Sequence, residues 1–189
     1  AAWSVNVRGV RNLAEAAYRV GAKLIHFSSD YAIRPVNEYA WTKRASESLA
    51  DISIRVKVYD ASHWAVRALR NRQEVSLTTE EFCNPITSTT VAATLGELLR
   101  LGIGGVISLG TTERLSWFEV GCAWADALGV SRDLVRPVRT VVSPVPRLAE
   151  MFLPPAELLA LGVALPTVEA DLREHIRCRL EYPSELGSA

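Results

Sequence analysis

Cysteine and lysine are both scarce in this chain of 189 residues. The three cysteines lie far apart and show neither a Cys-x-x-Cys pattern nor a cysteine and histidine spacing suited to a metal. They therefore argue against a disulfide framework and against a zinc site, and we predict no metal ligands. Because widely spaced, unpaired cysteines are typical of a reducing compartment, we expect a cytoplasmic protein.

An excess of charge and a long apolar run are also absent. Lysine plus arginine and aspartate plus glutamate are both 21, so the formal net charge is zero. Without a broad basic field, neither nucleic acid nor an anionic membrane is an expected partner. Charges or prolines interrupt every apolar run before the roughly 18 residues that a spanning helix needs. The N-terminus shows no basic segment followed by an apolar stretch, so we expect no signal peptide.

What the chain does contain is an alternation of helical and strand-like patterns. Residues 4–21 carry apolar side chains at helical intervals and end at Gly21, a residue type that favours the end of a helix. Residues 22–30 form a short apolar run that ends in Ser-Ser-Asp, which is typical of a buried parallel strand whose carboxyl end opens onto a site. His26 lies inside this run, and we expect a hydrogen-bonded core histidine rather than a catalytic one.

The next segments repeat this order. Asn37 can cap a helix over residues 38–50, and residues 52–60 alternate like a strand. Two helices and two strands within 60 residues predict a doubly wound α/β sheet. The remaining predicted segments are a helix over 62–73, an extended stretch over 74–88, a helix over 89–102, a strand, a turn and a helix over 105–130, irregular chain over 137–155, and a last helix over 167–180.

Tyr39 precedes Lys43, one of the three lysines, by four positions. On a helix this spacing places both side chains on one face, but it is common by chance and also fits an ordinary solvated surface. The pair gains weight because it opens a helix after a strand, at the edge where open α/β sheets bind ligands. An ammonium group lowers the pKa of a nearby tyrosine, and a serine hydroxyl can bind the same substrate oxygen. The pair and a serine of the preceding strand are therefore candidates for acid–base chemistry on a carbonyl.

Several stretches, in this order, resemble the extended short-chain dehydrogenase/reductases: VNVRGVRNLAEAA, KLIHFSSDYAI, NEYAWTK, NPITSTTVAATLGELL and GVISLGTTERLSWFEVGCAWADALG. The SSDY sequence after the strand, and a proline-rich segment before LGVALPTVEADLREHI, are most similar to the dTDP-4-dehydrorhamnose reductase branch. The resemblance covers nearly the whole chain. It implies a partial Rossmann-like doubly wound parallel sheet with a smaller mixed α/β substrate-binding part.

The resemblance also implies roles for individual residues. Tyr39 would donate the proton, Lys43 would bind the nicotinamide ribose and tune Tyr39, and Ser29 would orient the carbonyl. Asp30 and Tyr31 would lie next to a nucleotide-sugar substrate, with NADP or NAD as the cofactor. The expected activity is reduction of a 4-keto sugar nucleotide. The alternatives are a non-catalytic truncated relative that acts as a binding or regulatory subunit, and a sugar-nucleotide epimerase or dehydratase.

One family motif is missing from the sequence. The family's dinucleotide-binding domain begins with a strand, a Gly-x-x-Gly-x-x-Gly turn and a helix, and the glycines of this chain do not fall in that pattern. We therefore expect negligible dinucleotide binding by this chain alone. We divide it into residues 1–60, the C-terminal half of a Rossmann-like domain to which strand 105–110 returns, and residues 61–189, mainly the substrate-binding part.

Two explanations of the missing motif stay open. Either the native protein extends upstream of Ala1, or the chain stands alone and covers its exposed sheet edge in another way, for which a homo-oligomer is one option.

Other conspicuous residues are predicted to serve structure. Asn6 matches the family's helix asparagine, for which a packing role and a proton relay are both open. The arginines between residues 67 and 72 fit a solvated helix face better than a diphosphate site. Cys83 has no histidine close in sequence and is not expected to be a nucleophile. Packing in a core or an interface is expected of the five tryptophans, Trp3, Trp41, Trp64, Trp117 and Trp124.

Overall fold

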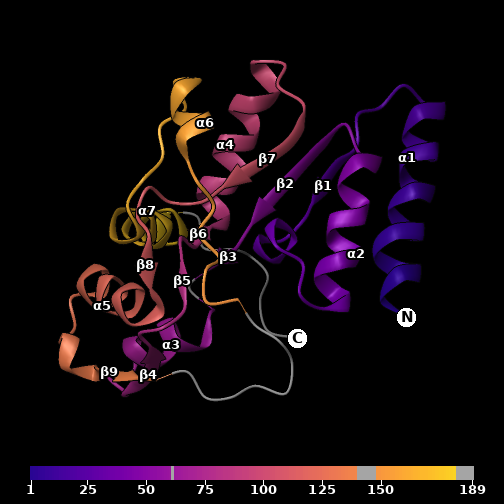
Figure 1. Ribbon diagram of the computed structural model, residues 1–189. Coiled ribbons are helices and arrows are strands. Elements are labelled where there is room, and N and C mark those ends of the chain that lie inside the picture. Colours follow the sequence, from indigo (N-terminus) through magenta and orange to yellow (C-terminus); the bar gives the residue numbers. More distant parts are fainter. Residues whose placement is uncertain (61, 140–147, 182–189) are drawn as a thin grey trace, which may run out of the picture.

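A parallel sheet forms the centre of the molecule. The computed structural model describes residues 1–60, 62–139 and 148–181. In this sheet β1 (Ile25–Phe27), β2 (Ile52–Val56) and β7 (Gly105–Leu109) lie in the order β1-β2-β7 (Figure 1). Ile52 faces Ile25 on one side and Gly105 on the other. The predicted α/β class with a parallel sheet is confirmed, since a strand far along the sequence returns to pair with β2.

The central strand β2 is buried because it has a neighbour on both sides. Ile52, Ile54 and Val56 are at most 7% exposed and belong to one apolar cluster. Helix α4 (Ser88–Arg100) and the short helix α6 (Ala156–Ala160) add side chains to this cluster. Its further buried members are Ile86, Val91, Leu98, Ile107, Leu109, Leu158 and Val163.

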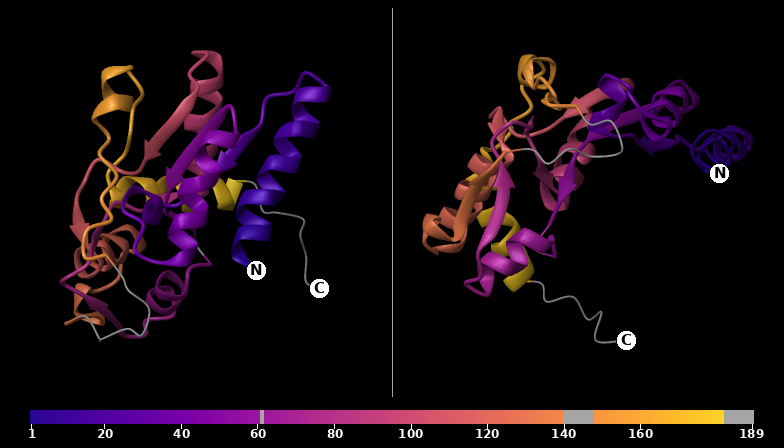
Figure 2. Two further views of the ribbon diagram at one scale, coloured as in Figure 1. Left: turned by 45° about the vertical axis from the view of Figure 1, so that its right-hand side comes forward. Right: turned by 60° about the horizontal axis from the view of Figure 1, so that its bottom comes forward.

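The N-terminal helices lie together at one end of the molecule. A π-helical segment (Ser4–Gly9) continues into α1 (Val10–Arg19), and α1 lies beside α2 (Glu38–Ser46) in Figures 1 and 2. The helical spacing predicted this helix but not its π-helical first turn, a form that often marks functional sites. Within it, Asn6 Nδ2 donates to Thr42 Oγ1 of α2 at 2.9 Å, which gives Asn6 a role in packing the two helices.

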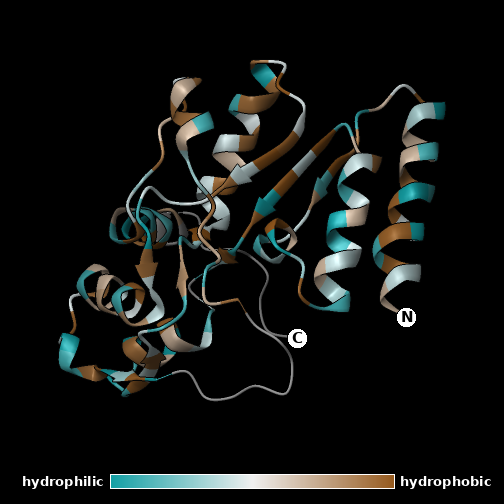
Figure 3. Ribbon diagram, in the orientation of Figure 1, coloured by the Kyte–Doolittle hydropathy of each residue, from teal (hydrophilic) through white to brown (hydrophobic). Residues whose placement is uncertain are grey.

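Strand β1 lies at the edge of the sheet in the part of the chain that the structure describes, and this corrects one prediction. We expected residues 22–30 to form a buried strand, yet the Phe27 side chain is 45% exposed. Burial of a strand depends on neighbours on both sides, whereas β1 pairs with β2 on one side. Apolar residues of α1 are exposed as well, and Figure 3 shows hydrophobic positions along this helix.

A second apolar cluster lies at the other end of the molecule. It contains α3 (Trp64–Arg70), α5 (Trp117–Leu128), α7 (Val168–Glu181) and a parallel pair of strands, β4 (Val75–Thr78) and β9 (Val135–Val138). Trp124 of α5 is fully buried there, with its ring centroid 5.2 Å from that of Tyr59. The remaining elements are η2 (Asp30–Ile33), η3 (Glu47–Leu49), β3 (Val58–Tyr59), β5 (Phe82–Cys83), β6 (Ile86–Thr87), β8 (Leu115–Ser116) and η4 (Arg132–Leu134).

Strand β9 corrects the prediction of irregular chain over 137–155. Pro137 lies inside β9, opposite Leu77 of β4. A proline is tolerated there because the described part of this sheet has two strands, so the missing N–H can face away from the partner. Residues 140–147 lie outside the described part of the chain. Residues 151–155 are irregular, as predicted.

The prediction that the tryptophans pack in a core or an interface is confirmed for Trp124, whereas three others do not lie in the core of this chain. Trp3, Trp41 and Trp64 are about half exposed, while Trp117 is half-buried. The predicted helices and strands otherwise agree with the structure to within a few residues. None of the helices in the described ranges has both the length and the apolar character to cross a membrane.

The last helix is joined to the rest of the fold by a buried carboxylate. Asp171 of α7 accepts hydrogen bonds from Thr87 N at 2.6 Å, from Thr87 Oγ1 at 2.7 Å and from Thr90 Oγ1 at 2.5 Å. These donors lie at the start of α4, where a carboxylate is favoured by the unpaired N–H groups and the helix dipole. Asp171 therefore links the C-terminal helix to the sheet side of the molecule.

Candidate functional site

The candidate site begins where β1 ends. After Phe27 the chain passes through Ser28 and Ser29 into the short 3-10 helix η2. Ser29 caps this helix: its Oγ accepts from Tyr31 N at 3.3 Å and donates to Asp30 Oδ1 at 2.8 Å. Tyr31 N also donates to Asp30 Oδ1, at 3.0 Å. These three predicted site residues are thus brought together by local hydrogen bonds at the carboxyl edge of the parallel sheet.

Helix α2 brings Lys43 to the same edge, and Tyr39 lies one turn earlier on this helix. Asn37 caps α2 as predicted, since its Oδ1 accepts from Ala40 N at 2.9 Å. Tyr39 follows in the first turn with its side chain half exposed. One turn later, Lys43 Nζ donates to the carbonyl oxygen of Phe27 at 2.6 Å. Lys43 therefore lies against the last residue of β1, two positions before Ser29.

The charge of Lys43 is influenced by its surroundings. Partial burial lowers the pKa of the Lys43 ammonium, and the negative charge of Glu47 opposes this change. The charge of Lys43 acts in turn on His26. Burial and this charge lower the pKa of His26 to about 4, so its ring is neutral near pH 7. His26 Nε2 is 2.9 Å from Ser46 Oγ. The predicted hydrogen bond of His26 is confirmed, although the ring is only partly buried.

Glu47 is a buried carboxylate that the sequence did not single out. It lies just after α2 and its two oxygens bind Arg55 of β2, at 2.8 Å from Nε and 2.6 Å from Nη2. Ser28 Oγ donates to Glu47 Oε1 at 2.8 Å. A buried charge requires such partners, and bidentate pairing with arginine is the strongest form. Glu47 thus holds α2, the end of β1 and β2 in one arrangement.

A second lysine, Lys57, lies near the Asp30 oxygen that does not bind Ser29. Lys57 Nζ is 3.3 Å from Asp30 Oδ2, and its ammonium lies 5.3 Å from the centre of the Tyr31 ring and 5.5 Å from that of Trp117. Asp30 Oδ2 is buried and, among the described residues, has no hydrogen bond of good geometry. The sequence presented Lys57 as the polar position of an alternating strand. The one signal in the sequence that could have drawn attention to Lys57 is that the chain contains only three lysines.

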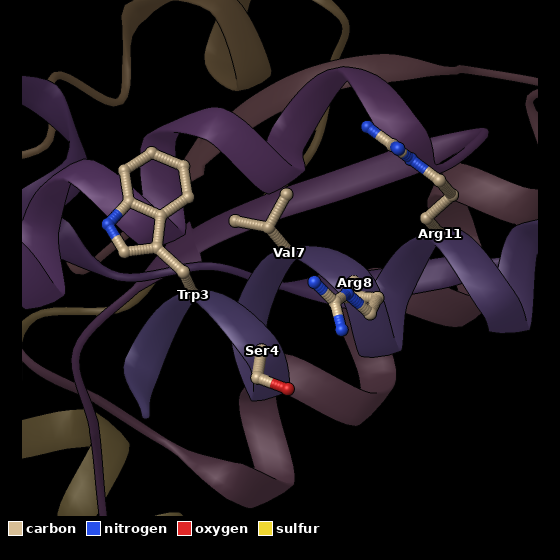
Figure 4. A pocket seen from close by; sticks show the side chains of 5 residues that line it. All are labelled: Trp3, Ser4, Val7, Arg8 and Arg11. Carbon is tan, nitrogen blue, oxygen red and sulfur yellow. The ribbon is translucent and has the colours of Figure 1, made fainter.

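Other residues considered in the sequence do not join this site. Cys83 is fully buried and desolvation raises its pKa, so its thiol stays protonated near neutral pH. The arginines between residues 67 and 72 lie on the exposed face of α3 and after it, as predicted. A hollow of about 200 Å³ lies along the first helix. Figure 4 shows the side chains that line it, those of Trp3, Ser4, Val7, Arg8 and Arg11. None of its lining residues belongs to the predicted catalytic set.

Comparisons with known proteins agree with this architecture. The family model described as the RmlD substrate binding domain matches residues 1–177. The chain is similar to the crystal structure of dTDP-4-dehydrorhamnose reductase from Bacillus anthracis in complex with NADP, with 22% identity and a TM-score of 0.76 over 91% of this chain and 71% of that one. A dTDP-4-dehydrorhamnose reductase from Clostridium acetobutylicum gives 21% identity and a TM-score of 0.78, over 94% and 73% of the two chains.

A more distant solved structure has the same fold. The enzyme WbmG of Bordetella bronchiseptica, in complex with NAD and UDP, is 19% identical with a TM-score of 0.70, over 99% of this chain and 71% of that one. At such identities the likeness concerns the fold, which is the Rossmann-like reductase fold predicted from the sequence. A search of curated protein sequences gives no significant match.

Proposed function

The chain belongs to the RmlD substrate-binding domain family, and from this membership we propose that its site serves the reduction of a 4-keto sugar nucleotide by NADPH or NADH. The observation that carries the proposal is the bond from Lys43 Nζ to Phe27 O, which holds Lys43 at the strand end that leads into Ser29. Tyr39 shares the helix and lies one turn earlier. In this proposal Tyr39 supplies the acid, Lys43 the cation and Ser29 the hydroxyl that carbonyl reduction requires.

In this proposal the carbonyl oxygen gains negative charge during reduction, and Tyr39 donates a proton to this oxygen. Lys43 stabilises the phenolate that remains, because an ammonium favours the charged form of a tyrosine. Ser29 orients the carbonyl. Its hydroxyl hydrogen is directed to Asp30 Oδ1, so it must turn away from Asp30 when the substrate is bound. Asp30 and Tyr31 would then lie beside the sugar, as the resemblance implies.

The residues of this chain fit one end of the nicotinamide cofactor. Lys43 has ammonium donors next to the sheet edge, as a ribose hydroxyl pair requires, and the half-exposed Tyr39 can reach a bound ligand. When bound, the cofactor would supply the hydride. Residues 1–189 contain no Gly-x-x-Gly-x-x-Gly turn to hold the pyrophosphate. We therefore assign residues 1–60 with strand 105–110 to the nicotinamide side, and residues 61–189 mainly to the nucleotide sugar.

Two other functions are alternatives to the reductase. A relative without catalysis would keep the nucleotide-sugar site and act as a binding or regulatory subunit. An epimerase or dehydratase would share the same fold, and it would return the cofactor to its starting redox state. The reading frame upstream of Ala1 distinguishes the first two: a strand with the glycine-rich turn supports the reductase, and a stop codon followed by a start supports the binding subunit.

The chain itself can be tested by ligand binding. Addition of dTDP-glucose should raise the melting temperature in a thermal-shift assay, because a ligand that binds only the folded state stabilises it. Micromolar NADPH alone should cause no clear shift. A stable complex with NADPH would contradict the inference that residues 1–189 lack a pyrophosphate site. If dTDP-glucose causes no shift, the proposed substrate class is contradicted.

The chemical role of Tyr39 needs a form of the protein that binds the cofactor. In the full-length protein, Tyr39→Phe should lower the rate of NADPH oxidation with a dTDP-4-keto-6-deoxy sugar by about 10²- to 10⁴-fold, the usual contribution of a general acid. The exposed Tyr18 of α1 provides a matched control, and Tyr18→Phe should keep the full rate. An unchanged rate for Tyr39→Phe with an intact fold would refute the assignment.

A further inference from the structure

We infer that Lys57 recognises an oxygen of the sugar in the nucleotide-sugar substrate and thereby determines which sugars are accepted. The inference rests on the proposed function, and it adds a residue that neither the motif nor the Tyr39–Lys43 pair includes. Lys57 stands at the break between β2 and β3. Its side chain lies at the carboxyl edge of the parallel sheet, where open α/β sheets bind their ligands.

The position of Lys57 is fixed relative to the candidate catalytic residues. Its carbonyl accepts from Ile86 N at 3.0 Å, which holds the backbone at the strand break. Its ammonium is 3.3 Å from Asp30 Oδ2, and the other oxygen of Asp30 accepts from Ser29 Oγ at 2.8 Å. One aspartate thus connects Lys57 to the serine that is proposed to orient the carbonyl.

Two aromatic rings from different parts of the fold hold the ammonium in place. Tyr31 comes from η2 beside the sheet, and Trp117 comes from the first turn of α5 in the second apolar cluster. Trp117 is itself held by the parallel ring of His63, 6.4 Å away between centroids, and by Trp124 at 6.1 Å. A lysine restrained in this way has lost side-chain freedom before any ligand arrives, so a new hydrogen bond costs less entropy.

The charge around Lys57 indicates which ligand group it suits. Asp30 offsets the positive charge and would repel a phosphate or carboxylate that approached the same place. The His63 ring adds no second cation, because burial and the charge of Lys57 lower its pKa. The Lys57 side chain is 27% exposed, against 3% for Asp30, so part of the lysine side chain is open to a ligand. A hydroxyl or keto oxygen of the sugar fits this pair, whereas the diphosphate does not.

The test separates the sugar from the rest of the nucleotide. Binding of dTDP-glucose and of dTDP is measured by calorimetry for the wild-type chain, for Lys57→Met and for the control Lys23→Met. Lys23 is an exposed residue outside the site. Wild type should bind dTDP-glucose more tightly than dTDP. In Lys57→Met the affinity for dTDP-glucose should fall about tenfold, as loss of a hydrogen bond to a charged donor predicts, while the affinity for dTDP and both affinities of Lys23→Met stay unchanged.

Each outcome is decisive. If wild type prefers dTDP-glucose and Lys57→Met keeps that preference, or weakens both ligands equally, the role of Lys57 is refuted while the proposed function stands. If wild type binds neither ligand, the proposed function fails and this inference with it. Circular dichroism checks that the variant is folded. Should Lys57→Met unfold, Lys57→Gln, which keeps a polar group beside Asp30, replaces it under the same criteria.

Discussion

Helices α1 and α5 show how differently two amphipathic helices can be covered in one chain. In α5, Val120, Trp124 and Ala125 are fully buried, because α3, α7 and the β4–β9 pair surround the helix. On α1, the Leu13 side chain is 59% exposed and Tyr18 is 87% exposed. Helix α1 chiefly contacts the π-helical segment that precedes it (Ser4–Gly9), among the contacts described, and this segment contacts α2. Periodicity reveals the apolar face of a helix but not whether a neighbour covers it.

The largest expected effect lies in the buried region. Trp124→Ala should lower the free energy of unfolding by about 3 to 5 kcal/mol, because it leaves a cavity in the second apolar cluster. Trp41 of α2 is 54% exposed and offers the matched control, so Trp41→Ala should cost less than about 0.5 kcal/mol. Urea denaturation measures both. Similar costs for the two variants would erase the contrast between the two ends of the molecule.

The next effect concerns the buried ion pair that holds α2 at the site. Glu47→Gln should cost about 3 kcal/mol, because the largely buried guanidinium of Arg55 loses its carboxylate. Glu15 on α1 is the control: its ion pair with Arg19 is exposed, and Glu15→Gln should change stability by about 0.5 kcal/mol or less. Denaturation at low and high salt should show little salt dependence for the Glu47 effect. A cost below about 1 kcal/mol would mean that Arg55 finds water or another partner.

Local signals predicted much of the fold, and they supplied the first residues of the candidate site. Asn37 caps α2 as expected because its bonding partner lies three residues away. Tyr39 and Lys43 were visible through their spacing in the sequence. Glu47 and Arg55, by contrast, become a pair only when α2 is packed against β2. Such partners are chosen by tertiary packing, which no local pattern encodes.

Lys57 and Phe27 are two further residues whose neighbours a local sequence pattern could not reveal. The strand pattern identified Lys57 as a polar position but could not supply Tyr31 and Trp117, which come from distant segments. The apolar run identified Phe27 as a strand residue but could not reveal that β1 lies at a sheet edge. In both cases the residue type and its local conformation were predictable, and its neighbours were not.

A smaller effect is expected from pH. The pKa of His26 is about 4 in the folded state, below its ordinary value of 6.5, because of burial and the charge of Lys43. The unfolded chain therefore binds more protons between these two values, so this contribution to stability is complete above pH 6.5 and is lost as the pH falls toward 4. Urea denaturation of wild type and His26→Gln at several pH values should show a shallower decline for the variant. The lowered pKa of His63 affects both proteins in the same way, so it does not alter the comparison. If stability falls equally with pH in wild type and His26→Gln, the lowered pKa of His26 is contradicted.

The smallest expected effect gives the sharpest test of the exposed end. Leu13→Ala removes a side chain that is 59% exposed, and alanine favours a helix at least as well as leucine, so stability should change by less than about 0.5 kcal/mol. Denaturation midpoints should also be independent of protein concentration. A loss of 2 kcal/mol or more, together with a midpoint that rises with concentration, would show that another molecule covers this face in solution. The contrast between α1 and α5 would then belong to the isolated chain and not to its assembled form.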